Sequence, residues 1–368
     1  MTSPTDHSNG VYVASGYGLK LFVERGHLVV EDGIGRDRRN TRLNRATSGL
    51  RRLVVLGHTG YITLDALRWI RDVGAAFIQI DRDGTLVTAT AAERLHEAKL
   101  RRAQVLAAES DLGRQAMIRL LRIKLERQAD LVERRLSHLK SSIVRDHKHR
   151  VSIGDAIREQ AEALHPDQSW AELRKLESIA GRYYWQTWAL VPVRFDRKLR
   201  GSVPDHWHTA GPRTSRVDRQ WPRRAMTPAH AALNYAYAIL EAETMIAAYA
   251  IGFDPALGLM HSDSRYRGNL AVDLMEPLRP LADETVLDRL EERELHRGDV
   301  LETPRGVCRL GEALAHDLAG RASAFRQPVA LITEDTAAVV SGSAVRTPLT
   351  RRKHRAATGA AVRGLPAD

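Results

Sequence analysis

Hydrophobic and polar positions alternate in short runs over residues 11–90, and turn residues separate these runs. Runs of this kind predict β-strands. Gly26 lies between the first two runs and suits a tight hairpin. The predicted strands are Leu19–Val23, Leu28–Val30, Leu53–Gly57 and the two halves of segment 75–87, which an Asp-Gly turn divides. Residues 11–90 are therefore predicted to form a small β-rich domain.

One segment inside this domain has helical spacing instead. Thr63 is a candidate N-cap and Gly74 is a candidate C-cap of a short helix between them. Its expected apolar stripe consists of Leu64, Leu67 and either Ile70 or Val73. We expect this helix to be the only one in the β-rich domain.

The pattern changes at Ala91, after which long segments without proline are rich in helix-forming residues. Further helices are predicted over 170–189 and, in the most apolar stretch, from Thr227 to Gly252. One apolar stripe at helical spacing runs through Leu121, Leu125, Val132 and Leu136. Residues 91–325 are predicted to form a mostly α-helical domain, so the fold class is α+β.

Three other segments lack this patterning. Residues 1–10 are polar and lack the pattern of a signal peptide, so we expect a flexible tail. Residues 196–224 form a long basic loop with three prolines, and loops of this length are usually functional or disordered. Residues 340–368 are predicted to be a basic, disordered tail. No apolar run approaches the ~20 residues that cross a bilayer, so we expect a cytoplasmic protein without membrane contact.

The charge balance points to a polyanion partner. The chain has 56 lysine and arginine residues against 45 acids, a net charge of +11. Basic clusters lie at Arg38–Arg45, Gly211–Arg224 and Arg351–Arg355. This surplus favours binding to nucleic acid over the alternative of a simply solvated, arginine-rich surface. The single cysteine, Cys308, excludes an internal disulfide and a multi-cysteine zinc site, and we expect it to be a small core residue.

Candidate chemistry lies where acids interrupt apolar segments. Asp273 and Glu276 share one face of a predicted helix whose neighbours are apolar, and His261 precedes them in a loop. By pattern alone, these acids form either half of a metal site or a surface pair with Arg279. Glu177 raises the same choice between a site acid and a solvent-facing one. The chain lacks the His-Glu-x-x-His, P-loop and Gly-x-Ser-x-Gly motifs, so those enzyme classes lose support.

A set of motifs resembles the CRISPR-associated spacer integrase, the universal adaptation nuclease of CRISPR systems. The matching elements are Leu233-Asn234-Tyr235-Ala236-Tyr237, Gly252-Phe253-Asp254-Pro255 through Gly258 to His261, Asp273-Leu274-Met275-Glu276 and Arg279-Pro280. Upstream, Glu177 precedes Tyr184 and Trp185 with the family's spacing. The resemblance covers roughly residues 11–325.

This resemblance implies a β-sandwich-like N-terminal domain followed by a larger all-α catalytic domain. It also implies a metal-dependent DNA endonuclease and integrase that joins short DNA duplexes to a CRISPR array by 3′-hydroxyl transesterification and cleaves branched DNA. Glu177, His261 and Glu276 match the family's ligands for Mg²⁺ or Mn²⁺, and Asp273 matches an acid that assists catalysis. The implied partners are double-stranded and branched DNA, a second copy of the chain and the small second adaptation protein. The arginines expected to contact DNA are Arg213, Arg216, Arg223, Arg224, Arg265, Arg267 and Arg279.

Two alternatives stay open at this point. The family often has asparagine where this chain has His230, and the basic loop and arginine-rich tail are long for common members. A stand-alone or transposon-borne integrase of the casposon type has the same motifs. A non-catalytic DNA-binding scaffold of the same fold is the second alternative.

Overall fold

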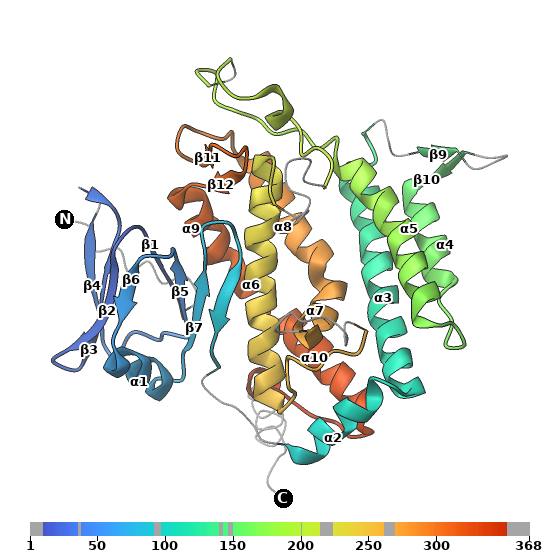
Figure 1. Cartoon of the computed structure of the whole chain (residues 1–368), viewed down its shortest axis with the longest axis horizontal. Helices are drawn as coiled ribbons and strands as arrows, with labels where there is room; N and C mark the ends of the chain where they lie inside the picture. The colour runs from blue at the N-terminus through green and yellow to red at the C-terminus, as the bar shows by residue number, and fades with distance from the viewer. Residues whose placement is uncertain are drawn as a thin grey trace, which may run out of the picture.

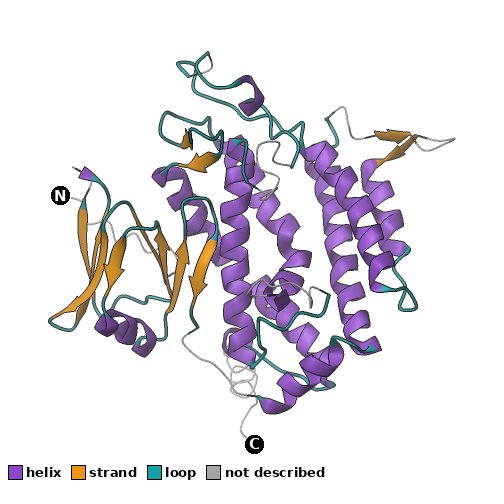
Figure 2. Cartoon of the chain, viewed as in Figure 1, coloured by secondary structure: helices purple, strands orange, loops and turns teal. Residues whose placement is uncertain are grey.

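The computed structural model describes residues 10–35, 38–91, 97–139, 143–145, 150–199, 201–213, 224–260 and 269–351. It has a β-rich N-terminal region and a larger helical region, which lie side by side in Figure 1 and Figure 2. The predicted α+β class and the order of the two regions are confirmed. The strands of the first region are β1 (Val11–Ser15), β2 (Leu19–Glu24), β3 (His27–Asp32), β4 (Arg39–Leu43), β5 (Arg52–Leu56), β6 (Gly60–Ile62), β7 (Ala76–Ile80) and β8 (Leu86–Ala89).

These strands form two four-stranded sheets with the orders β1-β5-β7-β8 and β4-β3-β2-β6. The β2–β3 hairpin turns at Gly26, whose φ of +81° suits glycine. Tyr12 and Leu53 of one sheet face Leu21 and Leu28 of the other in a shared core. The two sheets therefore pack face to face as the expected sandwich.

The first sheet is buried on both of its faces. Val13 and Val54 point away from the sandwich core and join the core of the helical region, while Ala14 and Val55 point into the sandwich. Side chains alternate between faces along a strand, so continuous apolar runs such as "VYVAS" are explained by burial on both sides. This sheet joins the two regions, and the Arg52 guanidinium also reaches Glu243 of the helical region at 2.7 and 2.8 Å.

Helix α1 (Leu64–Asp72) has the predicted N-cap, because the Thr63 side chain accepts a hydrogen bond from the amide of Ala66. Its predicted buried stripe is confirmed at Ile70 and wrong at Leu64 and Leu67. The side that packs on the sandwich contains Ala66, Trp69 and Ile70, while Leu64 is 80% exposed. Burying the large Trp69 ring removes more apolar surface from water than burying a leucine does. Its indole N–H also finds a partner in the carbonyl of Gly26.

The buried helix α6 stands near the middle of the molecule in Figure 1, between the strands β7 and β8 and the other helices. As predicted, α6 begins after Thr227, which caps it, and ends at Gly252 with a left-handed φ of +98°. A helix that is apolar on nearly all sides belongs in a core. The helices are α2 (Ala98–Ala107), α3 (Asp111–Leu131, extended by a π-helical turn Val132–Leu136), α4 (Ile153–Glu162), α5 (Trp170–Trp188), α6 (Pro228–Ile251), α7 (Asn269–Met275), α8 (Arg279–Glu292), α9 (Glu312–Gly320) and α10 (Arg326–Ser341).

Short elements complete this region. The predicted stripe on α3 is confirmed, because all four of its residues are buried. The region is not purely helical, since its described residues also form small hairpins. Their strands are β9 (Ile143–Arg145), β10 (Arg150–Ser152), β11 (Val300–Glu302) and β12 (Cys308–Leu310), and 3-10 turns lie at Asp205–Trp207, Glu276–Leu278 and Arg321–Ala324. None of the helices in the described part of the chain is long and apolar enough to span a membrane.

The C-terminal limit of the helical region differs from the prediction. Helix α10 packs on α6 and α3, beyond the expected end at residue 325. The expected disordered tail begins later than residue 340, because Thr347 and Thr350 are buried. The amide of Thr347 donates to buried Glu334 at 2.7 Å, and the Thr350 hydroxyl donates to the same carboxylate. The buried carboxylate of Glu334 explains why the segment with Thr347 and Thr350 is ordered, because a buried charge needs hydrogen-bond donors. The remaining tail, 352–368, and residues 1–9 lie outside the described residues.

The first part of the predicted basic loop is packed rather than free. Trp207 is buried, and its ring stacks on Phe195 with centroids 6.3 Å apart. The carbonyl of His208 accepts a hydrogen bond from the amide of Val193. Residues 214–223 of this loop lie outside the described residues.

Candidate active site

Three elements that are far apart in sequence bring a lysine and two acids together. The Nζ of Lys124 on α3 lies 2.5 Å from Oε1 of Glu177 on α5. The same nitrogen lies 2.6 Å from Oε2 of Glu276, the first residue of a 3-10 turn. Two of the three predicted metal ligands, Glu177 and Glu276, are therefore neighbours across one ammonium group.

The turn that carries Glu276 is held from two sides. Arg279 donates from Nε to Oε1 of Glu276 at 2.7 Å, and Arg127 of α3 donates to the carbonyl of Pro277 at 2.8 Å. Pro277 follows Glu276 directly and pre-sets the turn, because its ring fixes φ. These contacts hold the carboxylate against α3.

The charges at this site stabilise one another. Burial alone would raise the pKa of Glu276, but Arg279 and Lys124 outweigh burial and lower it to about 2. Burial would lower the pKa of Lys124, yet the two carboxylates raise it. At neutral pH, Glu276 is therefore ionised and Lys124 is charged.

The donor set fits a divalent cation with oxygen ligands. Both carboxylates converge on the same positive charge, and Mg²⁺ and Mn²⁺ are bound by such oxygens. Oε2 of Glu276 is buried and has the Lys124 ion pair but no well-aligned hydrogen bond, so it can turn to another cation. Within the described residues, no three His, Cys, Asp or Glu side chains are grouped closely enough to hold a metal ion.

The third predicted ligand, His261, lies outside the described residues, but the chain that leads to it is anchored at this site. The carbonyl of Met260 accepts a hydrogen bond from Arg174 of α5 at 2.9 Å. Arg174 lies one helical turn before Glu177 on the same helix. The residue before His261 is therefore tied to the helix that carries the first acid.

Asp273 is placed differently from the other acids. It is fully buried on α7, and its Oδ2 accepts hydrogen bonds from the amides of Leu259 and Met260 at 2.6 and 3.0 Å. The same oxygen would lie 3.1 Å from a Cβ on Gly258, so this position favours glycine. These contacts identify Asp273 as a residue that positions the segment before His261.

A second buried group behind the site was missed by sequence reasoning. The Asp283 carboxylate of α8 accepts hydrogen bonds from the hydroxyls of Tyr184 and Tyr237 at 2.6 and 2.5 Å. Burial raises the pKa of Asp283 to about 6, although both hydroxyls act in the opposite direction. The Arg279 guanidinium lies over the Tyr237 ring, 4.7 Å from its centroid.

A sequence signal for these missed residues did exist. Lys124 lies next to Leu125 and three residues after Leu121, on the buried face of α3. Asp283 lies next to buried Ala282 and three residues before buried Val286. A charged residue on an apolar helix face has to be paired, because an unpaired buried charge is costly. The spacing alone does not name the partner.

The predicted DNA-contacting arginines have different environments. Arg213 donates to Oδ1 of Asn234 at 2.9 Å and lies over the Trp185 ring at 5.2 Å. Arg279 is largely buried against Glu276, so its first role is within the site. Arg224 lines a pocket on the other side of α6. The four remaining arginines, Arg216, Arg223, Arg265 and Arg267, lie outside the described residues.

Several other polar and aromatic residues have structural roles. Tyr184 and Trp188 are completely buried, which favours core packing over base stacking. Glu243 is paired with Arg52, and His230 is buried at the start of α6. Cys308 is a buried core residue, and burial raises the pKa of its thiol.

Comparison with known proteins places this geometry in a family. The family model described as CRISPR associated protein Cas1 matches residues 12–321. The CRISPR-associated endonuclease Cas1 1 of Archaeoglobus fulgidus is 27% identical over 307 residues, which cover 82% of this chain and 83% of the relative. The CRISPR-associated endonuclease Cas1 2 of Pyrobaculum aerophilum is 27% identical over 315 residues, covering 83% and 90%.

Solved structures show the same fold. A casposase bound to its integration product superposes with a TM-score of 0.73 at 20% identity, covering 90% of this chain and 91% of the casposase. A Cas1 protein from Thermotoga maritima has a TM-score of 0.66 at 15% identity, covering 90% and 96%. Because the family model spans most of the sequence, the chain belongs to the CRISPR-associated Cas1 family.

Proposed function

We propose that this protein is a metal-dependent DNA endonuclease and integrase of CRISPR adaptation. The observation that carries the proposal is the convergence of Glu177 and Glu276 on one cationic position inside a Cas1 fold. The Cas1 relatives from Archaeoglobus fulgidus and Pyrobaculum aerophilum are named endonucleases, which supports the same chemistry here.

In this proposal, Glu177, Glu276 and His261 hold Mg²⁺ or Mn²⁺ beside a DNA phosphodiester. When bound there, such a cation would stabilise the charge that develops on the phosphate and would lower the pKa of an attacking hydroxyl. A 3′-hydroxyl oxygen forms the new bond to phosphorus as the bond to the leaving strand breaks. One phosphodiester replaces another, so the joining step needs no external energy source. The same residues cleave branched DNA when the exchange runs in the reverse direction.

Lys124 gives this site a defined resting state. Its ammonium attracts both carboxylates and keeps them close together when they would otherwise repel each other. A divalent cation on the same oxygens requires the ammonium to move away. Lys124 therefore competes with the metal and preserves the spacing of its ligands.

We also propose DNA and protein partners. The net charge of +11 supports binding to double-stranded and branched DNA. A structure named Cas6-RT-Cas1–Cas2 complex has a TM-score of 0.64 at 16% identity over 90% of this chain and 35% of that chain. By analogy, the small second adaptation protein is the proposed protein partner.

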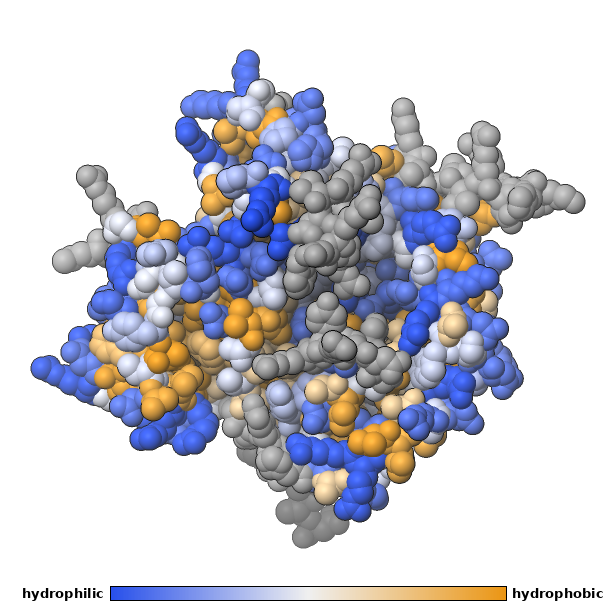
Figure 3. Space-filling model, viewed as in Figure 1, coloured by the Kyte–Doolittle hydropathy of each residue, from blue (hydrophilic) through white to orange (hydrophobic). Residues whose placement is uncertain are grey.

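Apolar surface supports a homodimer. Figure 3 shows hydrophobic patches over the N-terminal region, to the left. Exposed apolar side chains of this region lie on β6, β8 and α1 and in the loops before β2 and after β3, and exposed apolar surface is typical of protein contacts. These residues are Tyr17, Ile34, Tyr61, Leu64, Leu67 and Val87.

Cleavage of branched DNA with Mn²⁺ tests the proposal. We expect Glu276→Gln to lower the cleavage and joining rates by at least about 100-fold, because loss of a ligand exceeds the usual effect of an outer partner. The DNA affinity of Glu276→Gln should stay within a few fold of the wild-type value. His261→Ala should show the same loss of cleavage and joining with a similar DNA affinity. Glu126→Gln is a matched control, since Glu126 is exposed on α3, the helix of Lys124. If wild type and Glu276→Gln bind DNA but are equally inactive, the chain is a scaffold.

A further inference from the structure

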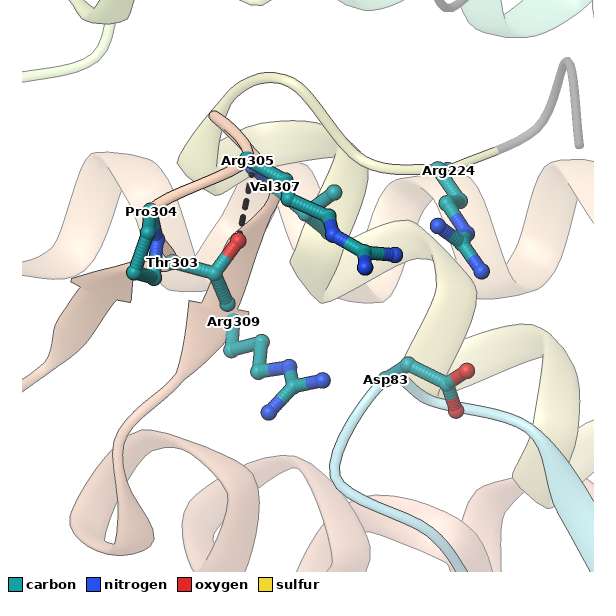
Figure 4. Close-up of a pocket in the computed structure, with 7 residues that line it drawn as sticks. All are labelled: Asp83, Arg224, Thr303, Pro304, Arg305, Val307 and Arg309. Carbon is teal, nitrogen blue, oxygen red and sulfur yellow. Dashed lines mark hydrogen bonds between the residues drawn. The ribbon is translucent and has the colours of Figure 1, made fainter. Parts of the chain in front are cut away.

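A hollow of about 390 Å³ lies away from the proposed metal site, between the β11–β12 turn, the segment before α6 and the β7–β8 turn. We call it the arginine pocket. Figure 4 shows that three guanidinium groups point into it and that one carboxylate lies opposite. Its lining residues are Asp83, Arg224, Thr303, Pro304, Arg305, Val307 and Arg309.

The pocket and the proposed metal site lie on different faces of α6. The β7–β8 turn packs closely on Tyr235, since a Cβ on Gly84 would lie 3.1 Å from that ring. Tyr237 instead faces Asp283 and Arg279. Residues two apart on a helix point about 200° apart. A group bound in the arginine pocket is therefore separated from Glu276 by the central helix.

The hairpin that carries two of the arginines is fixed in place. The amide of Cys308 donates to the carbonyl of Ala225 at 2.8 Å, which ties β12 to the segment before α6. The turn closes with Thr303 and Gly306, whose φ is +71°. Buried Cys308 anchors the strand between Arg305 and Arg309. The guanidinium groups are thus presented by a rigid support.

The charges in the pocket are unbalanced. Three arginines face one acid, Asp83, and Oδ1 of that acid already accepts a hydrogen bond from the amide of Thr85 at 3.0 Å. Arg305 and Arg309 form no ion pair with any carboxylate in the described part of the chain. Nε of Arg309 is buried without a hydrogen-bond partner there. Clustered guanidinium groups repel one another, and a multivalent oxyanion offsets this repulsion and accepts their donors.

We propose that the arginine pocket binds a phosphate group of DNA at a second position, apart from the metal site. This inference rests on the proposed function for its DNA ligand. A phosphodiester supplies the acceptor oxygens that guanidinium groups recognise. A contact of this kind sets the path and register of the duplex and takes no part in bond breaking. The pocket thereby binds the part of the duplex that passes behind α6.

The test is the salt dependence of DNA binding by the full-length Arg305→Gln/Arg309→Gln variant. Fluorescence anisotropy with a labelled duplex gives the affinity at several salt concentrations. We expect several-fold weaker binding and a slope of log affinity against log salt reduced by about one. Cleavage by the DNA-saturated variant with Mn²⁺ should match wild type. The matched control is Arg68→Gln/Arg71→Gln, which removes the same charge from exposed positions on α1.

The other outcomes are also decisive. Inorganic phosphate bound by wild type and not by the variant, with unchanged DNA binding, identifies a phosphate site that serves a free anion instead of DNA. Unchanged binding of both ligands overturns the proposal. A variant that becomes monomeric in sedimentation also overturns it, because the arginines would then pair with acids of a second copy.

Two further measurements distinguish a failure of the pocket proposal from a failure of the proposed function. The Arg305→Lys/Arg309→Lys variant keeps the charge, so it should retain most of the wild-type salt slope. A loss of slope equal to that of the glutamine variant would overturn the proposal. If the wild type and the glutamine variant differ in salt slope but the wild type shows no Mn²⁺-dependent cleavage, the proposed function is contradicted and the pocket assignment stands.

Discussion

The Nζ of Lys124 lies 2.6 Å from Oε2 of Glu276, and both side chains are buried. A buried ion pair is stable only when its charges remain paired. Because the same ammonium also contacts Glu177, it occupies the place that the proposed divalent cation requires. The pair therefore links the stability of the metal-free protein to its affinity for metal.

Lys124→Met should separate these two effects. Without metal, the free energy of unfolding should fall by about 3 kcal/mol, because the carboxylates lose a buried partner. Mn²⁺ should bind about tenfold tighter, a gain of about 1.4 kcal/mol, because its competitor is gone. Calorimetry with Mn²⁺ and chemical unfolding with and without Mn²⁺ measure both changes. Lys175→Met, at an exposed position on α5, is the control. Weaker Mn²⁺ binding by Lys124→Met would contradict the competition.

Asp273 variants should distinguish positioning from direct chemistry. Asp273→Ala leaves the amides of Leu259 and Met260 without their acceptor, so the free energy of unfolding should fall by about 3 kcal/mol. Mn²⁺ affinity should fall too, because the segment before His261 moves. Asp273→Asn keeps an acceptor oxygen and should preserve most of both properties. An Asn variant with normal stability and Mn²⁺ affinity but no cleavage would instead favour a direct catalytic role.

Asp283 should make stability depend on pH in an unusual direction. Its pKa of about 6 exceeds the ordinary 3.8, so between these values the folded protein binds a proton that the unfolded chain has released. The contribution of Asp283 to stability is therefore greatest below pH 4 and is lost as the pH rises through 6. Relative to Asp283→Asn, wild type should lose about 2 kcal/mol between pH 4 and pH 7.

Urea unfolding of both proteins across this pH range measures that difference. The groups facing Asp283 are Tyr184, Tyr237, Arg213 and Arg279, which are unchanged in the variant. Other carboxylates titrate in both proteins, so only the difference between the two curves is informative. A difference that stays constant from pH 4 to pH 7 would contradict the raised pKa.

Two truncations should test where the C-terminal tail begins. Ending the chain after residue 351 removes basic residues of the tail and leaves the contacts to Glu334 intact. We expect normal thermal stability and a smaller salt slope for DNA binding. Ending it after residue 345 removes Thr347 and Thr350 and leaves buried Glu334 without these donors, so the melting temperature should fall. Equal melting temperatures for both truncations would show that residues 346–351 do not support the fold.

Local sequence signals were reliable where local physics decides the structure. Thr227 and Gly252 bound α6 as predicted, because a cap acts on the amides and carbonyls beside it. Gly26 places the first hairpin for the same kind of reason. The motif resemblance also identified Glu177 and Glu276 as partners, although they lie far apart in the chain.

The face of α1 illustrates what pattern could not decide. Two helical stripes are available in its sequence, and the leucine stripe was the wrong one. The helix packs on the sandwich through the side that contains Trp69. The Trp69 ring belongs to the sandwich core, and its N–H donates to the carbonyl of Gly26. The shape of the surface that a helix covers is a property of the assembled fold.

By itself, the sequence determined the α+β order, the boundaries of elements such as α6, the positive charge and, through its motifs, the family, and it predicted the acids of the proposed site. Only the tertiary structure decided that Lys124 lies between those acids, that Asp273 supports the segment before His261, and that arginines from separate elements share one pocket. The physical reason is the distance along the chain over which each interaction acts. Caps, turns and periodicity depend on neighbours a few residues away, whereas the partner of a buried charge is set by how distant helices pack.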